Sequence, residues 1–177
     1  MQLAKVIGDV VATRKDESLV GIKLLVIRPL TPDREPAGRP LVAVDAVGAG
    51  VGDVVFSCAA RKRAFRFTPP SRRSTPASSE SWTTGTMQIA RVVGSVVATQ
   101  KHKTFEGAKL LLVQPLDAVD DAPRGAAMLA VDGVGAGVHE KVLIVLEGRA
   151  AGEALGKKGA PVDAAIVGIV DEVVVKE

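Results

Sequence analysis

The chain has 177 residues, of which 47% are apolar and only 3% aromatic, and its formal net charge is +3. No run approaches the roughly 18 consecutive apolar residues that a membrane-spanning helix needs, and the single cysteine, Cys58, excludes an internal disulfide. We therefore expect a cytoplasmic protein without membrane contacts, with a core of Val, Ile, Leu and Ala.

The first half of the chain reads as short strands separated by turns. Residues 2–14 and 21–30 form two apolar-rich runs, and the valine content favours strands, because β-branched side chains suit a pleated surface. The next segment, 31–39, is rich in Pro, Asp and Gly, as turns require. A third strand is predicted over 40–47, and a fourth begins at Val51.

This pattern occurs twice. Met1-Gln2-Leu3-Ala4-Lys5-Val6-Ile7-Gly8 returns as Met87-Gln88-Ile89-Ala90-Arg91-Val92-Val93-Gly94, and Val44-Asp45-Ala46-Val47-Gly48-Ala49-Gly50 returns as Val131-Asp132-Gly133-Val134-Gly135-Ala136-Gly137. Two copies of a long repeat indicate duplicated domains rather than a solenoid. Strands are predicted in the second copy over 88–100, 107–116, 127–134, from 138, and over 165–175, with loops at 117–125 and 148–161. Five short strands in about 90 residues favour a small all-β barrel.

The first copy stops matching the second after Phe56. Residues 57–86 are rich in Ser, Arg and Pro and hold six basic residues against one acidic residue, a net charge of +5, so the remainder carries −2. The chain therefore divides into an incomplete barrel at 1–56, a basic segment at 57–86 and a complete barrel at 87–177. The composition of the basic segment is typical of a disordered linker.

A frameshift is the sharper hypothesis for this segment. If residues 73–83 are read one nucleotide early, permitted codons encode Val-Asp-Ala-Ser-Ile-Val-Gly-Ile-Val-Asp, and the second copy has Val-Asp-Ala-Ala-Ile-Val-Gly-Ile-Val-Asp at 162–171. Sequencing the DNA between codons 56 and 87 tests this. Either way the first copy lacks its own last strand, so we expect two unpaired edges there unless a neighbour supplies a strand.

The chain resembles the pentameric shell vertex proteins of bacterial microcompartments, the carboxysome and ethanolamine-utilisation vertex family. The resemblance rests on the opening motif at 87–99 and in variant form at 1–13, and on Gly-x-Lys-Leu-Leu-x-Val-Gln-Pro-Leu at 107–116. It also rests on the Val-Asp-x-Val-Gly-Ala-Gly motifs and on residues 161–171. It covers nearly all of the second copy and residues 1–56 of the first.

This resemblance implies a five-stranded OB-like barrel, duplicated here, with the first copy lacking its last strand. It implies homopentamers that cap the vertices of a shell otherwise tiled by hexameric shell proteins. The family is not catalytic, so it implies neither an active site nor a cofactor. Two departures concern loops: Gly148-Arg149-Ala150-Ala151 replaces a more polar stretch, and His139 stands where the first copy has Gly52.

Two glycine turns are the first candidate sites. They form either tight turns that need a positive φ or loops near a five-fold axis, at the rim of a pore. A nucleotide cradle is disfavoured, because Asp53 stands where G-x-G-x-x-G needs glycine and no helix follows. Asp45 and Asp132, which precede the turns, are expected to accept hydrogen bonds from turn amides. The turn residues are Gly48, Ala49, Gly50, Gly135, Ala136 and Gly137.

Six polar residues at matching positions are candidates for a subunit interface, with a solvated strand face as the alternative. They are Thr13, Lys15, Lys23, Thr99, Lys101 and Lys109. No catalytic constellation is present, so we expect no enzyme. His102 and His139 lie apart from other ligands, and Cys58 lies in the suspect segment, so no metal site is expected.

The competing function is that of an OB-like nucleic-acid-binding module. It rests on the basic segment with Phe65, Phe67 and Trp82, because stacking and phosphate contacts use those residue types. The rest of the chain is slightly acidic and poor in aromatics, which argues against a polyanion as partner. We therefore expect no nucleic-acid partner.

Overall fold

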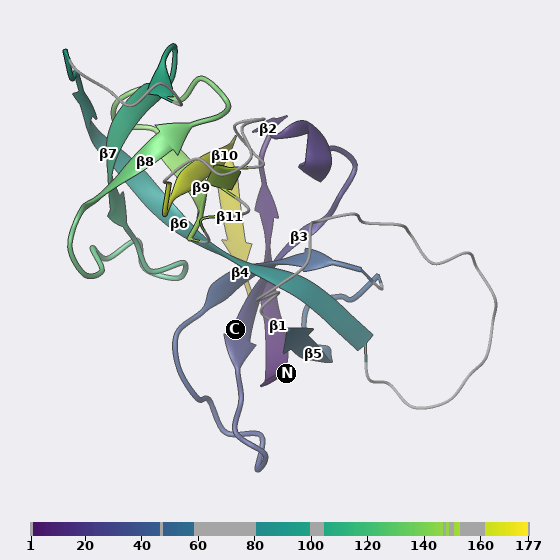
Figure 1. Cartoon of the computed structure of the whole chain (residues 1–177). Helices are drawn as coiled ribbons and strands as arrows, with labels where there is room; N and C mark the ends of the chain where they lie inside the picture. The colour runs from purple at the N-terminus through teal and green to yellow at the C-terminus, as the bar shows by residue number, and fades with distance from the viewer. Residues whose placement is uncertain are drawn as a thin grey trace.

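A computed structural model describes residues 2–46, 48–58, 81–99, 105–146, 148, 151–152 and 162–176, with the backbone alone at 58 and 81–86 (Figure 1). We call residues 2–58 the first repeat and residues 87–176 the second repeat. Among the described residues, no helix has the length and apolar character needed to cross a membrane.

The first repeat consists of antiparallel strands joined by turns. β1 (Gln2–Val11) pairs with β3 (Leu24–Pro29) on one side and, through its first residues, with β5 (Val54–Cys58) on the other. β3 pairs in turn with β4 (Leu41–Asp45). A two-residue strand, β2 (Arg14–Lys15), and a 3-10 turn, η1 (Glu17–Leu19), connect β1 to β3.

The second repeat forms a closed five-stranded barrel followed by an outer strand. β6 (Ser81–Val96) pairs with β7 (Lys109–Pro115), which pairs with β8 (Met128–Asp132). β10 (Ala165–Ile169) joins β8 in parallel and β9 (Lys141–Val145) in antiparallel orientation, and β9 returns to β6. The outer strand is β11 (Glu172–Val175).

The first barrel is closed by the beginning of β6. Residues 81–84 of that strand lie between β4 and β5, in the place that β10 occupies in the second barrel. The direction is reversed, because β6 runs antiparallel to β4 and parallel to β5, whereas β10 runs parallel to β8 and antiparallel to β9. One long strand therefore serves both barrels, as Figure 1 shows.

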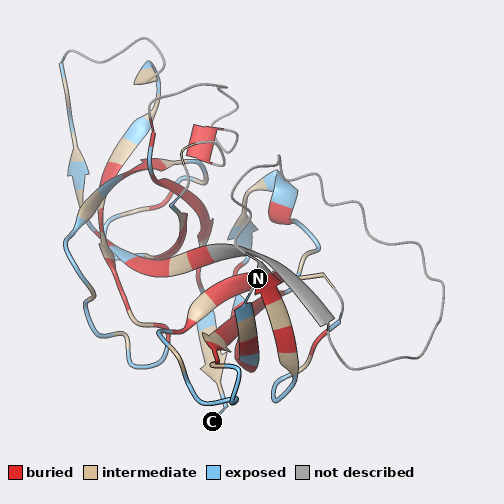
Figure 2. Ribbon diagram, turned by 60° about the horizontal axis from the view of Figure 1, so that its bottom comes forward, coloured by how far each residue is buried: buried red, intermediate tan, exposed pale blue. Residues whose placement is uncertain are grey.

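Both barrels enclose buried residues, drawn in red in Figure 2, and most core positions of the first repeat have an apolar counterpart in the second. Val6, Leu25 and Val55 in the first core correspond to Val92, Leu111 and Val142 in the second. The second core adds Ile144, Ala164 and Ile166. The position of Ile144 is taken in the first repeat by Ser57, which is buried and donates a hydrogen bond to the carbonyl of Gln2 at 3.3 Å. The two cores therefore diverge where the two sequences diverge.

The all-β class and the five-stranded barrel of the second repeat are confirmed. The first strand was expected to run on to residue 14, but it ends at Val11 and resumes as the separate β2. The fourth strands begin at Val54 and Lys141, three residues later than predicted from 51 and 138, because the glycine turns extend further.

Two further differences concern the end of the chain and the basic segment. The single strand predicted over 165–175 is broken at 170–171 into β10 and β11. The neighbouring strand that closes the first barrel comes from 81–84, inside the segment expected to be a linker. Residues 59–80 lie outside the described residues, so the linker and frameshift interpretations remain predictions.

Candidate functional site

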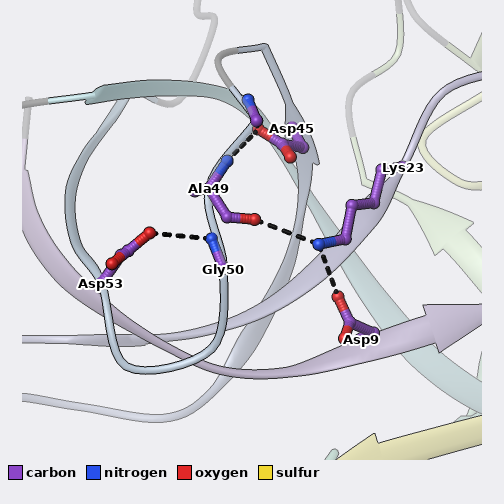
Figure 3. Close-up of polar contacts among 7 residues, drawn as sticks. Asp9, Lys23, Asp45, Ala49, Gly50 and Asp53 are labelled. Carbon is purple, nitrogen blue, oxygen red and sulfur yellow. Dashed lines mark hydrogen bonds and ion pairs between the residues drawn. The ribbon is translucent and has the colours of Figure 1, made fainter.

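The glycine turn of the first repeat follows β4 and is held by carboxylates (Figure 3). Oδ1 of Asp45 accepts hydrogen bonds from the amides of Gly48, at 2.9 Å, and Ala49, at 3.2 Å. The amide of Gly50 donates to Asp53 at 2.8 Å. Gly48 has a φ of 82°, a left-handed conformation that disfavours side chains, so the backbone itself requires glycine at this position.

The turn of the second repeat has the same construction. Oδ1 of Asp132 accepts from the amides of Val134 and Gly135, at 3.0 and 2.9 Å, and the amide of Gly137 donates to Glu140 at 2.7 Å. Gly135 has a φ of 83°. The expectation that the aspartates satisfy turn amides is therefore confirmed, and those bonded carboxylate oxygens serve the loop as structural acceptors.

A lysine reaches across to each turn. The ammonium group of Lys23 donates to the carbonyl of Ala49 at 3.0 Å and lies 3.2 Å from the carboxylate of Asp9. The ammonium group of Lys109 donates to the carbonyl of Ala136 and lies 3.5 Å from the carboxylate of Asp132. Each lysine thus connects the start of a strand, β3 in the first repeat and β7 in the second, to the glycine turn of its own repeat.

Besides the shared strand β6, the two repeats are joined where the end of the second repeat meets the beginning of the first. β11 pairs antiparallel with β1, with Val174 opposite Asp9, and β10 pairs antiparallel with β2, with Gly168 opposite Lys15. A shared apolar cluster lies beneath these strands, and it includes Ile7 and Val42 from the first repeat. The second repeat therefore continues the sheet of the first and covers part of its core.

A carboxylate closes this contact. Oδ2 of Asp171 accepts hydrogen bonds from the amide of Thr13 at 2.6 Å and from its hydroxyl at 2.5 Å. These hydrogen bonds lower the pKa of Asp171 below its ordinary value, since they favour the ionised form. Asp171 is solvent-accessible, so the bond holds the rim of the contact rather than its core.

The six residues predicted for a subunit interface do not share one surface in the structure. Thr13 and Lys15 lie at the contact between the repeats. Lys23 and Lys109 bind the glycine turns of their own repeats. Thr99 is exposed, and Lys101 lies outside the described residues.

The histidines, the cysteine and the basic segment were the remaining candidates from the sequence. His139 is exposed, and its amide donates to the carbonyl of Val92 at 2.8 Å. Where the chain is described, no group of three or more His, Cys, Asp or Glu side chains is placed to hold a metal ion. His102, Phe65, Phe67 and the basic residues of 57–86 lie outside the described residues. Trp82 and Cys58 are described by their backbone alone, in β6 and β5.

Comparison with known proteins decides the family. The family model described as "Ethanolamine utilisation protein EutN/carboxysome" matches residues 1–77 and 87–171. The chain belongs to this family. The match in the first repeat extends past residue 56, where the likeness between the two repeats ends, and stops at residue 77.

Individual members of the vertex family match about half of the chain. The carboxysome shell vertex protein CcmL of Nostoc sp. is 45% identical over 91 residues, which is 51% of this chain and 89% of that protein. The microcompartment shell vertex protein EutN of Salmonella typhimurium is 42% identical over 88 residues, 50% of this chain and 87% of that protein. The solved structure of Gloeobacter violaceus CcmL is 44% identical over 50% of this chain and 89% of its own, with a TM-score of 0.46.

Sequence reasoning missed the most extensive site, the strand pairing between the repeats. Asp171 and β11 were placed at the end of an ordinary last strand, and β2 was merged with β1. A signal was present in Asp171 itself, because an acidic residue between two apolar runs, 165–170 and 173–175, is unfavourable inside a strand and is typical of a strand break.

Proposed function

We propose that this chain is a structural subunit of the pentameric vertices of a bacterial microcompartment shell. The observation that carries the proposal is the family match over both repeats, together with relatives that are named as shell vertex proteins and are matched over most of their length. No substrate or cofactor enters this role.

The contact between the repeats supports assembly into a ring. It joins two different surfaces, since the second repeat offers β10 and β11 and the first offers β1 and β2. A head-to-tail contact of this kind generates closed rings when its rotation closes. The contact between the two repeats of this chain is therefore of a kind that could join neighbouring modules around a five-fold axis.

We place the two glycine turns near that axis, where they would line the rim of a pore. Gly48 and Gly135 are exposed, and each turn is braced by an aspartate and a lysine of its own repeat. A side-chain atom at Gly135 would lie 3.9 Å from the guanidinium of Arg14 in the first repeat. The turn thus lies beside the contact at which two modules meet.

The natural partners of such a pentamer are the hexameric proteins of the shell facets. The test is co-production of the full chain with hexameric microcompartment shell proteins, followed by electron microscopy. We expect closed polyhedral shells with five-fold density from this chain at the vertices, and open or tubular assemblies when the chain is left out. Shells that close equally well without the chain, or that exclude it, would show the proposal to be wrong.

A further inference from the structure

The first barrel is completed by a strand from outside its own repeat. We call the position between β4 and β5 the slot, and residues 81–84 of β6, the resident strand, occupy it. Thr83 is paired there with Asp45 of β4 and Ser57 of β5. The corresponding position of the second barrel, between β8 and β9, holds Ile166 of β10. The resident strand thus takes the place of a β10-type strand, in the opposite direction.

The core around the slot is smaller than its counterpart. Each of the seven buried apolar residues of the first core has an equivalent in the second core, which holds ten. The three additional residues are Ile144, Ala164 and Ile166. The first repeat has Ser57 at the position of Ile144, and no described side chain takes the place of the other two. A strand that carries apolar residues at these two positions would therefore add contacts that the described first core lacks.

The resident strand is attached over a short length. It is paired with four residues of β5 but, on its other side, only with Val44 and Asp45 of β4. The register between β4 and β6 then shifts before Met87, in the stretch that contains Gly85. The pairing of β6 with β9 begins at Met87. The resident strand can therefore leave the slot without the loss of any strand pair of the second barrel.

We propose that the slot is a binding site for an extended peptide with the sequence pattern of β10, which is supplied by another polypeptide and adds parallel to β4. The occupant is argued from the second repeat, where β10 lies parallel to β8 and places Ala164 and Ile166 in the core. In strand addition, main-chain hydrogen bonds supply affinity and pockets for alternate side chains supply specificity. The slot is separate from the contact between the repeats, which uses β1 and β2.

The resident strand competes with such a peptide. A tethered segment acts at an effective concentration of the order of millimolar, so a free peptide must gain more from the core than the resident strand does. The apparent dissociation constant also rises as the fraction of chains with an open slot falls. Changes that loosen the resident strand should therefore strengthen the binding of any peptide that uses the slot.

The experiment titrates the full chain into a fluorescein-labelled peptide of residues 161–171 and follows fluorescence anisotropy. Proline is disfavoured inside a paired strand, so Thr83→Pro should open the slot and lower the apparent dissociation constant by about tenfold or more relative to wild type. Ser57→Ile supplies the residue that the second core has at Ile144, and it should also lower the constant. The same peptide with Ile166→Asp is the matched control and should not bind.

Hydrogen exchange measured by mass spectrometry locates the bound peptide. Binding in the slot should speed exchange in the resident strand and leave exchange in β10 unchanged. Faster exchange in β10 would show that the peptide replaces its own source strand, and it would overturn the proposal. So would equal binding of the Ile166→Asp peptide, or the absence of saturable binding to both Thr83→Pro and Ser57→Ile chains that circular dichroism shows to be folded.

Discussion

The two repeats show how one strand pattern reaches two different states of burial. Their inner faces match over most positions up to Val55 and Val142, as Leu25 and Leu111 do, because each is enclosed by a barrel. Their outer faces do not match, because the second repeat covers the first and, within the described residues, nothing equivalent covers the second at Val93 and Leu129. Burial of the outer face therefore depends on contact with another repeat, whereas burial of the inner face results from the folding of each barrel.

The largest expected effect comes from placing a charge at matching outer positions. Val42→Asp puts a carboxylate into the shared apolar cluster and should lower the free energy of unfolding by at least about 4 kcal/mol. Leu129 is half exposed, so Leu129→Asp should change the free energy of unfolding by less than about 0.5 kcal/mol. Urea titrations followed by circular dichroism compare the two, and equal losses would remove the distinction between covered and open faces.

The lysines of the glycine turns should show a smaller asymmetry. Asp132, the partner of Lys109, has a side chain only 2% exposed, whereas that of Asp9, the partner of Lys23, is 38% exposed. Removal of an ammonium group costs more stability when it leaves a buried carboxylate without that partner. Lys109→Met should therefore lower the free energy of unfolding by about 1–2 kcal/mol. Lys23→Met serves as the matched control and should lose less than about 1 kcal/mol. Thermal unfolding of both variants measures the difference, and a larger loss for Lys23→Met would contradict it.

The contact between the repeats should weaken in acid. The hydrogen bonds from Thr13 hold the pKa of Asp171 below its unfolded value of about 3.9. Their contribution is therefore fully present above that value and is lost as the pH falls through the folded pKa. Urea midpoints should decline between pH 5 and pH 3 more steeply in wild type than in Asp171→Asn. Identical declines would show that this carboxylate does not link the repeats.

The smallest effect concerns the residue that follows each glycine turn. His139 has a φ of 74°, and its counterpart Gly52 has a φ of 99°. Since a left-handed conformation is unfavourable for residues with a Cβ, His139→Gly should raise the free energy of unfolding by up to about 1 kcal/mol. Gly52→His enters open space and should lower it by a similar amount. Chemical denaturation of the pair tests this, and a loss of stability in His139→Gly would contradict it.

Local patterns predicted much of the site. The aspartates of the glycine turns bond amides only two to four residues away, so their role follows from neighbouring sequence. The reach of Lys23 and Lys109 to those turns could not be foreseen, because it joins residues 26 and 27 positions apart. The same applies to Thr13 and Asp171, which lie 158 positions apart.

The sequence by itself determined the duplication, most strands of each repeat and the loss of likeness after Phe56, since apolar runs and turn residues act within a few positions. Only the tertiary structure decided which strand closes the first barrel and in which direction it runs. It also decided that β11 belongs to the sheet of the other repeat. The physical reason is that a strand edge offers the same hydrogen-bonding groups to any strand, so its partner is selected by which apolar faces meet in the folded chain.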